Sequence, residues 1–220
     1  MIELSSFDAV IFDMDGTLAD SMGIWVEIDK KFIVDRGLAY PEGFQDKIHG
    51  LSFYECADLF INTFNLPDTH EELMKIWHDM AIDFYHEVVE LKPGAMEFLQ
   101  YLNNHGKKIA IASSAVPAMI QATIDRHNLS GLIPAFASSS DVKRGKPHPD
   151  VFLLAAERIN VAPERCIAFE DNFAGCQASI SAGMRVFGIE DATSAQFADQ
   201  IKEVTISLLP DFKGIENQFE

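Results

Sequence analysis

Short, almost purely apolar runs recur along the chain, and each one ends abruptly at polar residues. Runs without polar alternation are typical of strands buried on both faces, as in parallel sheets. They occupy residues 7–13, 108–112, 166–169 and 185–189, with a weaker run at 135–137. Helical patterns separate them at 95–104, 117–128, 149–159 and 173–182. Strand followed by helix, repeated, predicts an α/β fold with a doubly wound, Rossmann-like parallel sheet.

Residues 19–90 have a different character, because their pattern predicts helices throughout, at 22–36, 43–49, 53–64 and 69–90. Apolar and aromatic residues recur there at helical spacing, which is typical of the core of a small helical bundle. Since this stretch separates the first strand from the rest of the sheet, we expect an inserted α-helical cap domain. The α/β core domain then comprises residues 1–18 and 91–220. The chain crosses between the domains near 18–20 and 91–94, where we expect a hinge.

Polar residues at the ends of the predicted strands are the candidates for chemistry, because such ends converge on one crevice of a doubly wound sheet. They are Asp13 and Asp15 after the first run, Ser113 after the second, and Glu170 and Asp171 after the third. Two carboxylates at i and i+2, such as Asp13 and Asp15, repel each other unless a cation or a proton lies between them. Carboxylates suit Mg²⁺ as ligands, and a carboxylate is also the nucleophile wherever an aspartyl phosphate forms. An ordinary Asx turn is the competing interpretation.

The charge of the chain limits its partners. The net charge is −17, from 34 acidic and 17 basic residues. A field of this sign repels phosphate backbones, so we expect no nucleic-acid partner. A small phosphorylated molecule is repelled at long range as well. Its site therefore needs local positive charge from a metal and a few placed basic side chains.

The apolar content points to a water-soluble domain. Hydrophobic residues make up 48% of the chain, which suffices for a core. No apolar run approaches the roughly 20 residues that span a bilayer, so we expect no membrane partner. The first ten residues have no basic stretch before an apolar run, unlike a secretory signal, and the three cysteines show no CxxC spacing. We therefore expect a cytoplasmic protein.

Four short motifs, in this order, resemble those of the haloacid dehalogenase-like (HAD) hydrolase superfamily. The run Asp13-Met14-Asp15-Gly16-Thr17-Leu18 resembles motif one, and Ser113 resembles motif two. Lys146, in the run GKPHPD, resembles motif three, and the pair Glu170-Asp171 resembles motif four. The helical stretch directly follows motif one, as in members with an α-helical cap, and the layout is similar to the β-phosphoglucomutase and phosphatase branch. The resemblance spans essentially the whole chain.

The resemblance implies a role for each acidic residue. Asp13 would attack phosphorus and bind Mg²⁺ through its other oxygen. Asp15 would protonate the leaving group and then deprotonate the attacking water, and its backbone carbonyl would bind the metal. Asp171 would be the third metal ligand from the protein, with Glu170 acting directly or through a water.

The same resemblance implies the phosphate contacts. Ser113 and Lys146 would hold the transferring phosphoryl oxygens, and Lys146 would also offset the charge of Asp13. Thr17 and Ser114 are further candidates for phosphate binding. The implied partner is a small phosphorylated molecule, and the default oligomeric state of the family is the monomer.

Several reactions of the superfamily can be compared. Dehalogenases lack the second carboxylate of motif one, so Asp15 argues against them. Phosphonoacetaldehyde hydrolases use a cap lysine, and the candidate cap loop at 49–55 has none. Mutases carry a histidine after motif one and an arginine in the cap loop, where this chain has Trp25 and Phe53. Because neither aromatic residue supplies a cation for a second phosphate, we expect a phosphatase. A phosphosugar mutase is the alternative.

The cap residues Trp25, His49 and Phe53 are candidates for the substrate face, although Trp25 and Phe53 equally suit the core of the cap. An aromatic face of this kind suggests a sugar, polyol or nucleoside phosphate as the substrate. A non-catalytic protein that binds phosphorylated metabolites is a further alternative. It would leave the second carboxylate of motif one, Asp15, without a purpose.

Overall fold

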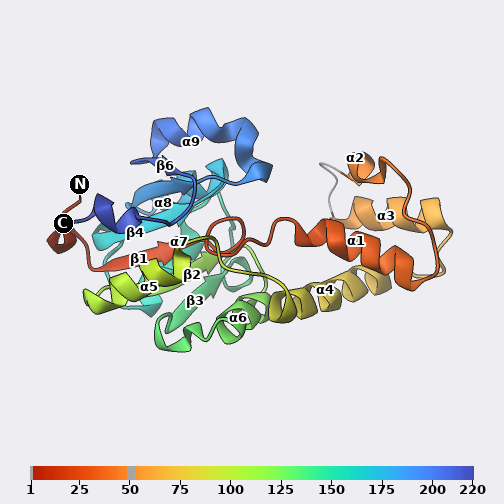
Figure 1. Cartoon of the computed structure of the whole chain (residues 1–220), viewed down its shortest axis with the longest axis horizontal. Helices are drawn as coiled ribbons and strands as arrows, with labels where there is room; N and C mark the ends of the chain where they lie inside the picture. Colours follow the sequence, from red (N-terminus) through yellow and green to blue (C-terminus); the bar gives the residue numbers. More distant parts are fainter. Residues whose placement is uncertain (1, 49–52) are drawn as a thin grey trace. The chain divides into compact units, whose positions relative to one another are not determined.

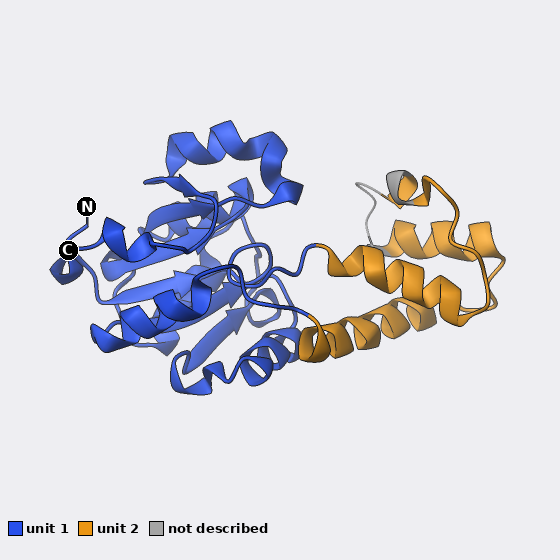
Figure 2. Ribbon diagram, in the orientation of Figure 1, with its two compact units in different colours: residues 1–22, 89–220 blue, residues 23–88 orange. Residues whose placement is uncertain are grey.

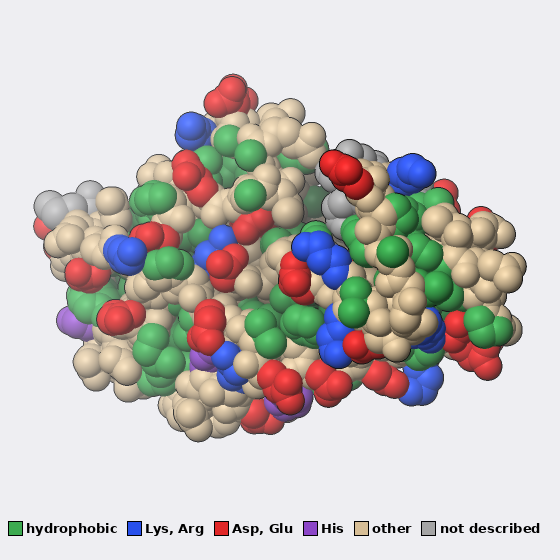
Figure 3. All heavy atoms as spheres, turned by 45° about the vertical axis from the view of Figure 1, so that its right-hand side comes forward, with side chains coloured by type: hydrophobic (Ala, Val, Ile, Leu, Met, Phe, Trp, Pro, Cys, Tyr) green, Lys and Arg blue, Asp and Glu red, His purple; other side chains and the backbone are tan. Residues whose placement is uncertain are grey.

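The computed structural model describes residues 2–48 and 53–220 (Figure 1). The chain forms two compact units, one of residues 1–22 and 89–220 and the other of residues 23–88 (Figure 2). Within the described residues, no helix combines the length and the apolar character that crossing a membrane requires. Acidic side chains are spread over the face shown in Figure 3 and form no single patch there.

The larger unit contains a six-stranded parallel sheet, which confirms the predicted α/β fold. Its strands are β1 (Ala9–Phe12), β2 (Lys108–Ser113), β3 (Ala135–Ser138), β4 (Cys166–Glu170), β5 (Arg185–Ile189) and β6 (Leu208–Leu209). Their order across the sheet is β3-β2-β1-β4-β5-β6. Phe12 of β1 pairs with Ile111 of β2 on one side and with Phe169 of β4 on the other. The residue after β1 therefore lies between the ends of β2 and β4.

Helices cover both faces of this sheet (Figure 1). They are α5 (Ala95–Asn104), α6 (Pro117–Arg126), α7 (Asp150–Arg158), α8 (Phe173–Ser181) and α9 (Ala198–Val204). The 3₁₀ helices are η1 (Leu4–Ser6), η2 (Leu129–Gly131), η3 (Ser139–Asp141), η4 (Pro163–Arg165), η5 (Ala192–Phe197) and η6 (Ile215–Gln218). Ala9 and Ile11 contribute to the core under α7 and α8. Phe12 stacks on Phe169 instead, with ring centroids 5.2 Å apart, within a cluster of aromatic side chains.

The smaller unit consists of the helices α1 (Ile24–Asp35), α2 (Phe44–Ile48), α3 (Phe53–Phe64) and α4 (His70–Glu87). Its core is aromatic, with Trp77 packed edge-on against Phe60 and Phe32 at centroid distances of 4.8 and 5.7 Å. Thr69 and Glu72 form a reciprocal capping box that starts α4. These contacts explain the helical spacing of apolar residues in this stretch.

The structure differs from the sequence expectations at several boundaries. Helix α4 ends at Glu87 rather than at residue 90, because the following residues pair with the first crossing segment. The N–H of Asp20 donates to the carbonyl of Glu90, and Ala19 forms an isolated bridge with Leu91. The strand β6 and the helix α9 were not predicted. They have two and seven residues, too few for a periodic signal.

Candidate active site

The candidate site lies at the carboxyl ends of the three central strands. Asp13 directly follows β1, Ser113 ends β2, and Glu170 ends β4 with Asp171 next to it. The N–H of Asp13 donates to the carbonyl of Phe169 at 2.9 Å, which continues the β1–β4 pairing into the loop. At most 4% of the surface of any of these four polar residues is exposed. Burial of so many polar groups at one edge requires specific partners.

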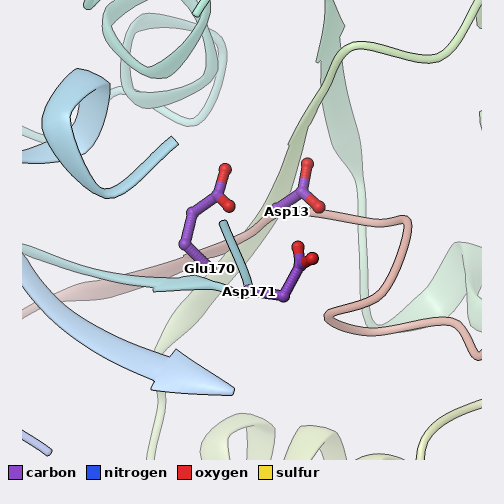
Figure 4. A group of neighbouring side chains, drawn as sticks. All are labelled: Asp13, Glu170 and Asp171. Carbon is purple, nitrogen blue, oxygen red and sulfur yellow. The ribbon is translucent and has the colours of Figure 1, made fainter. Parts of the chain in front are cut away.

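Three carboxylates form the centre of the site. Asp13, Glu170 and Asp171 each offer an oxygen, and these oxygens lie within 4.8 Å of one another (Figure 4). Burial raises the pKa of Glu170 to about 8, with the charge of Asp13 adding to it and the charge of Lys146 opposing it. Burial likewise raises the pKa of Asp171 to about 7, and the charge of Asp13 adds to the effect. Oxygen ligands in such a cluster fit a hard divalent cation such as Mg²⁺.

Lys146 supplies positive charge inside this cluster. Its Nζ donates to Oδ1 of Asp13 at 2.5 Å and also to Oε1 of Glu170. Burial alone would lower the pKa of Lys146, but the two carboxylates outweigh burial and the net shift is upward. Lys146 therefore stays an ammonium at neutral pH. One ammonium does not balance three ionised carboxylates. Without a metal ion, bound protons offset the remaining charge, as the raised pKa values of Glu170 and Asp171 indicate, and a metal ion would take the place of those protons.

Both carboxylate oxygens of Glu170 accept hydrogen bonds within the described structure. Its Oε1 accepts from Lys146, and its Oε2 accepts from the backbone N–H and the side-chain amide of Asn172, at 3.3 and 3.1 Å. A Cβ on Gly175 would collide with the carboxylate of Glu170. The glycine in the first turn of α8 thus makes room for Glu170.

The loop after β1 fits closely around Asp171. Gly16 has φ of 80°, and a Cβ there would lie 2.7 Å from Oδ2 of Asp171. Oγ1 of Thr17 donates to Oδ1 of Asp171 at 2.9 Å, and Thr17 is fully buried. The hydroxyl of Thr17, expected from the sequence at a phosphate, thus lies on a carboxylate. Asp15 accepts at Oδ1 a 2.6 Å hydrogen bond from Oγ of the buried Ser21.

A hollow of about 180 Å³ opens over the carboxylate cluster. It is lined by residues that the sequence singled out: Asp13, Asp15, Ser113, Ser114, Lys146 and Asp171. Asn172, Thr193 and Ser194 also line it, and sequence reasoning missed them. Thr193 and Ser194 follow β5, so the strand-end rule could have found them had it been applied to that strand. Ser21 carried no comparable signal.

The candidate cap residues belong to the smaller unit. Trp25 lies in the first turn of α1 and is partly buried. His49 lies outside the described residues. Phe53 begins α3, and its side chain lies outside the described part of the structure. Their role in substrate binding therefore stays a prediction.

Comparison with known proteins identifies relatives over most of the chain. Residues 10–189 match the family model described as haloacid dehalogenase-like hydrolase. The chain is 31% identical over 183 residues to a phosphorylated carbohydrates phosphatase of Thermotoga maritima, covering 83% of this chain and 85% of that protein. It is 32% identical over 201 residues to hexitol phosphatase A of Escherichia coli, with 90% of each chain covered.

A solved structure is similar as well. The crystal structure of a putative β-phosphoglucomutase from Thermotoga maritima superposes with a TM-score of 0.79 at 28% sequence identity. The match covers 91% of this chain and 93% of that one. The sequence comparisons and the structural comparison therefore each find relatives that match more than four fifths of the chain.

Proposed function

Because this chain belongs to the haloacid dehalogenase-like hydrolase family, as a phosphoric monoester hydrolase, we propose that it is a Mg²⁺-dependent phosphatase of small phosphorylated metabolites. The observation that carries the proposal is the environment of Asp13. Its carboxylate is buried, contacts the ammonium of Lys146 and lies beside two further carboxylates in a small polar hollow. A carboxylate held in this way is a positioned nucleophile.

In the first step, an oxygen of Asp13 attacks phosphorus, and the bond to the leaving oxygen breaks. Asp15 donates its proton to that leaving oxygen, so the product departs as an alcohol. Lys146 and the hydroxyl of Ser113 hold the phosphoryl oxygens during the transfer. An aspartyl phosphate on Asp13 results.

In the second step, Asp15 takes a proton from a water that attacks the same phosphorus. The bond from phosphorus to Asp13 breaks, and inorganic phosphate leaves. Asp13, Asp171, the backbone carbonyl of Asp15 and, directly or through a water, Glu170 would hold Mg²⁺. When bound, Mg²⁺ would neutralise charge on the transferring group.

The substrate class is proposed from the relatives and from the cap residues. Two relatives are named as phosphatases of phosphorylated carbohydrates and hexitols, which supports a sugar or polyol phosphate. Trp25, His49 and Phe53 would contact the leaving group. Trp25 and Phe53 stand where a mutase of this branch would carry a histidine and an arginine, which favours hydrolysis over phosphate migration. The same proposal takes the protein to be a monomer in the cytoplasm.

A mutase is the second candidate, since a solved structure titled putative β-phosphoglucomutase shares the fold. Phosphate release from sugar, polyol, glycerol and nucleoside phosphates, with Mg²⁺, tests both candidates. We expect the wild type to release phosphate and Asp13→Asn to release none. Asp8→Asn is the matched control, because Asp8 pairs with Arg165 on the surface. Isomerised sugar phosphate after priming with a sugar bisphosphate, without net release, would favour the mutase. No turnover at all would favour the binding protein.

A further inference from the structure

Lys92 forms a shielded ion pair close to the candidate site. Its Nζ lies 2.8 Å from Oδ2 of Asp191, and the two side chains are 10% and 5% exposed. The same ammonium lies 3.4 Å from the carbonyl oxygen of Glu190 and 3.9 Å from Oδ1 of Asp20. Lys92 itself is fixed by its backbone N–H, which donates to the carbonyl of Leu18 at 2.9 Å. The pair thus ties the segment after β5 to the crossing segments.

Asp191 uses its second oxygen to shape the segment that follows it. Oδ1 accepts from the backbone N–H of Thr193 at 2.9 Å and from its hydroxyl at 2.7 Å. These bonds cap η5 and set the direction of the chain toward Ser194. One carboxylate therefore joins Lys92 to the start of η5.

Ser194, in η5, connects this segment to Asp171 by a hydrogen bond. Its Oγ donates to Oδ2 of Asp171 at 3.3 Å, and Ser194 is 8% exposed. Thr17 donates to the other oxygen of Asp171 at 2.9 Å. Asp171 is thus held by one hydroxyl on each oxygen. Thr17 belongs to the loop after β1, whereas the position of Ser194 depends on η5.

Packing alone does not hold this segment. A cavity of about 490 Å³ lies beside it and is lined by Lys92, Asp191, Ala192, Ser194 and Ala195, among others. Asp171 and Ser194 line both this cavity and the hollow over the carboxylate cluster. Because the cavity rather than packed side chains lies on this side of the segment, the position of the segment depends more on its hydrogen bonds and on the ion pair with Lys92.

We infer that Lys92 is a positioning residue for the metal ligand Asp171, acting through Asp191 and Ser194. The inference rests on the proposed function, since it takes Asp171 as a ligand of Mg²⁺. Partners that orient a metal ligand typically contribute 10- to 100-fold in metal affinity. A purely electrostatic effect of Lys92 would change the Mg²⁺ affinity in the opposite direction, because removal of a cation near the site would strengthen Mg²⁺ binding.

Calorimetric titration of the metal-free protein with Mg²⁺ alone tests this inference. We expect Lys92→Met and Ser194→Ala each to weaken Mg²⁺ binding about tenfold. The double variant should bind no more weakly than either single variant, since both changes release the same carboxylate. The Mg²⁺ concentration for half-maximal turnover should rise by the same factor. Arg165→Met is the matched control, because it also removes one paired cation, and it should leave the affinity unchanged.

Other results would overturn the inference. Unchanged or tighter Mg²⁺ binding by Lys92→Met would do so, as would single effects that multiply in the double variant. If Lys92→Met does not fold, Lys92→Met with Asp191→Leu replaces the buried pair by apolar groups at constant net charge, and the same weakening is expected. A wild type that binds no Mg²⁺ would instead overturn the metal site of the proposed function.

Discussion

Oγ of Ser21 lies 2.6 Å from Oδ1 of Asp15, so a fully shielded hydroxyl holds the proposed acid–base group in one orientation. Both residues belong to the larger unit, just before the chain enters α1. The orientation of Asp15 is therefore set locally, by a side chain six residues further along.

Replacement of Ser21 should slow the proposed chemistry without weakening substrate binding. Ser21→Ala removes the donor to Asp15, so we expect kcat to fall about tenfold, with KM little changed. Steady-state kinetics on the best substrate measures both constants. Ser179→Ala is the control, because that buried hydroxyl donates only to backbone carbonyls of α8 among its described contacts. Equal kcat for Ser21→Ala and the wild type would contradict the proposed role.

Lys146 should be required for both stability and turnover. Lys146→Met leaves Asp13 and Glu170 buried without their counter-charge, which typically costs about 3–5 kcal/mol. We expect unfolding at lower urea concentration in metal-free buffer, partial recovery with Mg²⁺, and a loss of turnover of at least about a hundredfold. Lys108→Met is the control, since Lys108 donates to the carbonyl of Ile159. A variant as stable as the wild type without metal would contradict the electrostatic account.

Gly16 should be irreplaceable for two separable reasons. Gly16→Ala strains a residue at φ of 80°, and its Cβ would press on Asp171. Gly37→Ala is the matched control, because Gly37 has φ of 71° but nothing within 4 Å of an added Cβ. Both variants should lose about 1 kcal/mol of stability or more. We expect Gly16→Ala to lose in addition at least about tenfold in Mg²⁺ affinity. Equal Mg²⁺ affinities of the two variants would show that the close approach to Asp171 is unimportant.

Asp29 makes the smaller unit sensitive to pH. Burial raises the pKa of this residue of α1 to about 7, so the folded state retains a proton that the unfolded state releases near the ordinary pKa of an aspartate, 3.8. The folded state then binds more protons between these values, and stability falls as pH rises from about 4 to about 7. The loss is at most about 4 kcal/mol. Urea unfolding at pH 5 and pH 8 measures it.

The variant Asp29→Asn distinguishes the contribution of this carboxyl group to the pH dependence of stability from the contributions of all other groups. Asp29→Asn cannot ionise, so we expect it to be more stable than the wild type at pH 8 and to lose this advantage towards pH 4. Asp35→Asn is the control on the same helix, because Asp35 is exposed and pairs with Lys31. If Asp29→Asn is no more stable than the wild type at pH 8, ionisation of Asp29 does not destabilise the folded protein.

The sheet was predictable because burial on both faces leaves a strong sequence signal. All five predicted strands are present, and their polar ends include Asp13, Ser113 and Glu170. Lys146 could not be placed in this way, since it follows no strand. Its assignment depended on the resemblance to a family.

The remaining site residues depend on tertiary structure. The strand-end rule makes Ser194 a candidate, but its contact with Asp171 depends on the pairing of β5 with β4, which the sequence alone does not show. Nothing in the pattern around Thr17 indicates that its hydroxyl faces Asp171, which is 154 positions away. Pairings at such separations leave no periodicity in a single sequence.

The central place of β1 in the sheet also has a consequence for biosynthesis. Ala9 pairs with Lys108 and with Cys166, so a growing chain exposes the apolar β1 to the cell long before either neighbour has been translated. Such long-range pairing slows folding and leaves the nascent chain prone to aggregation. Lys146 and Asp171 lie more than a hundred residues after Asp13, so the site around this proposed nucleophile forms only after most of the chain has been translated.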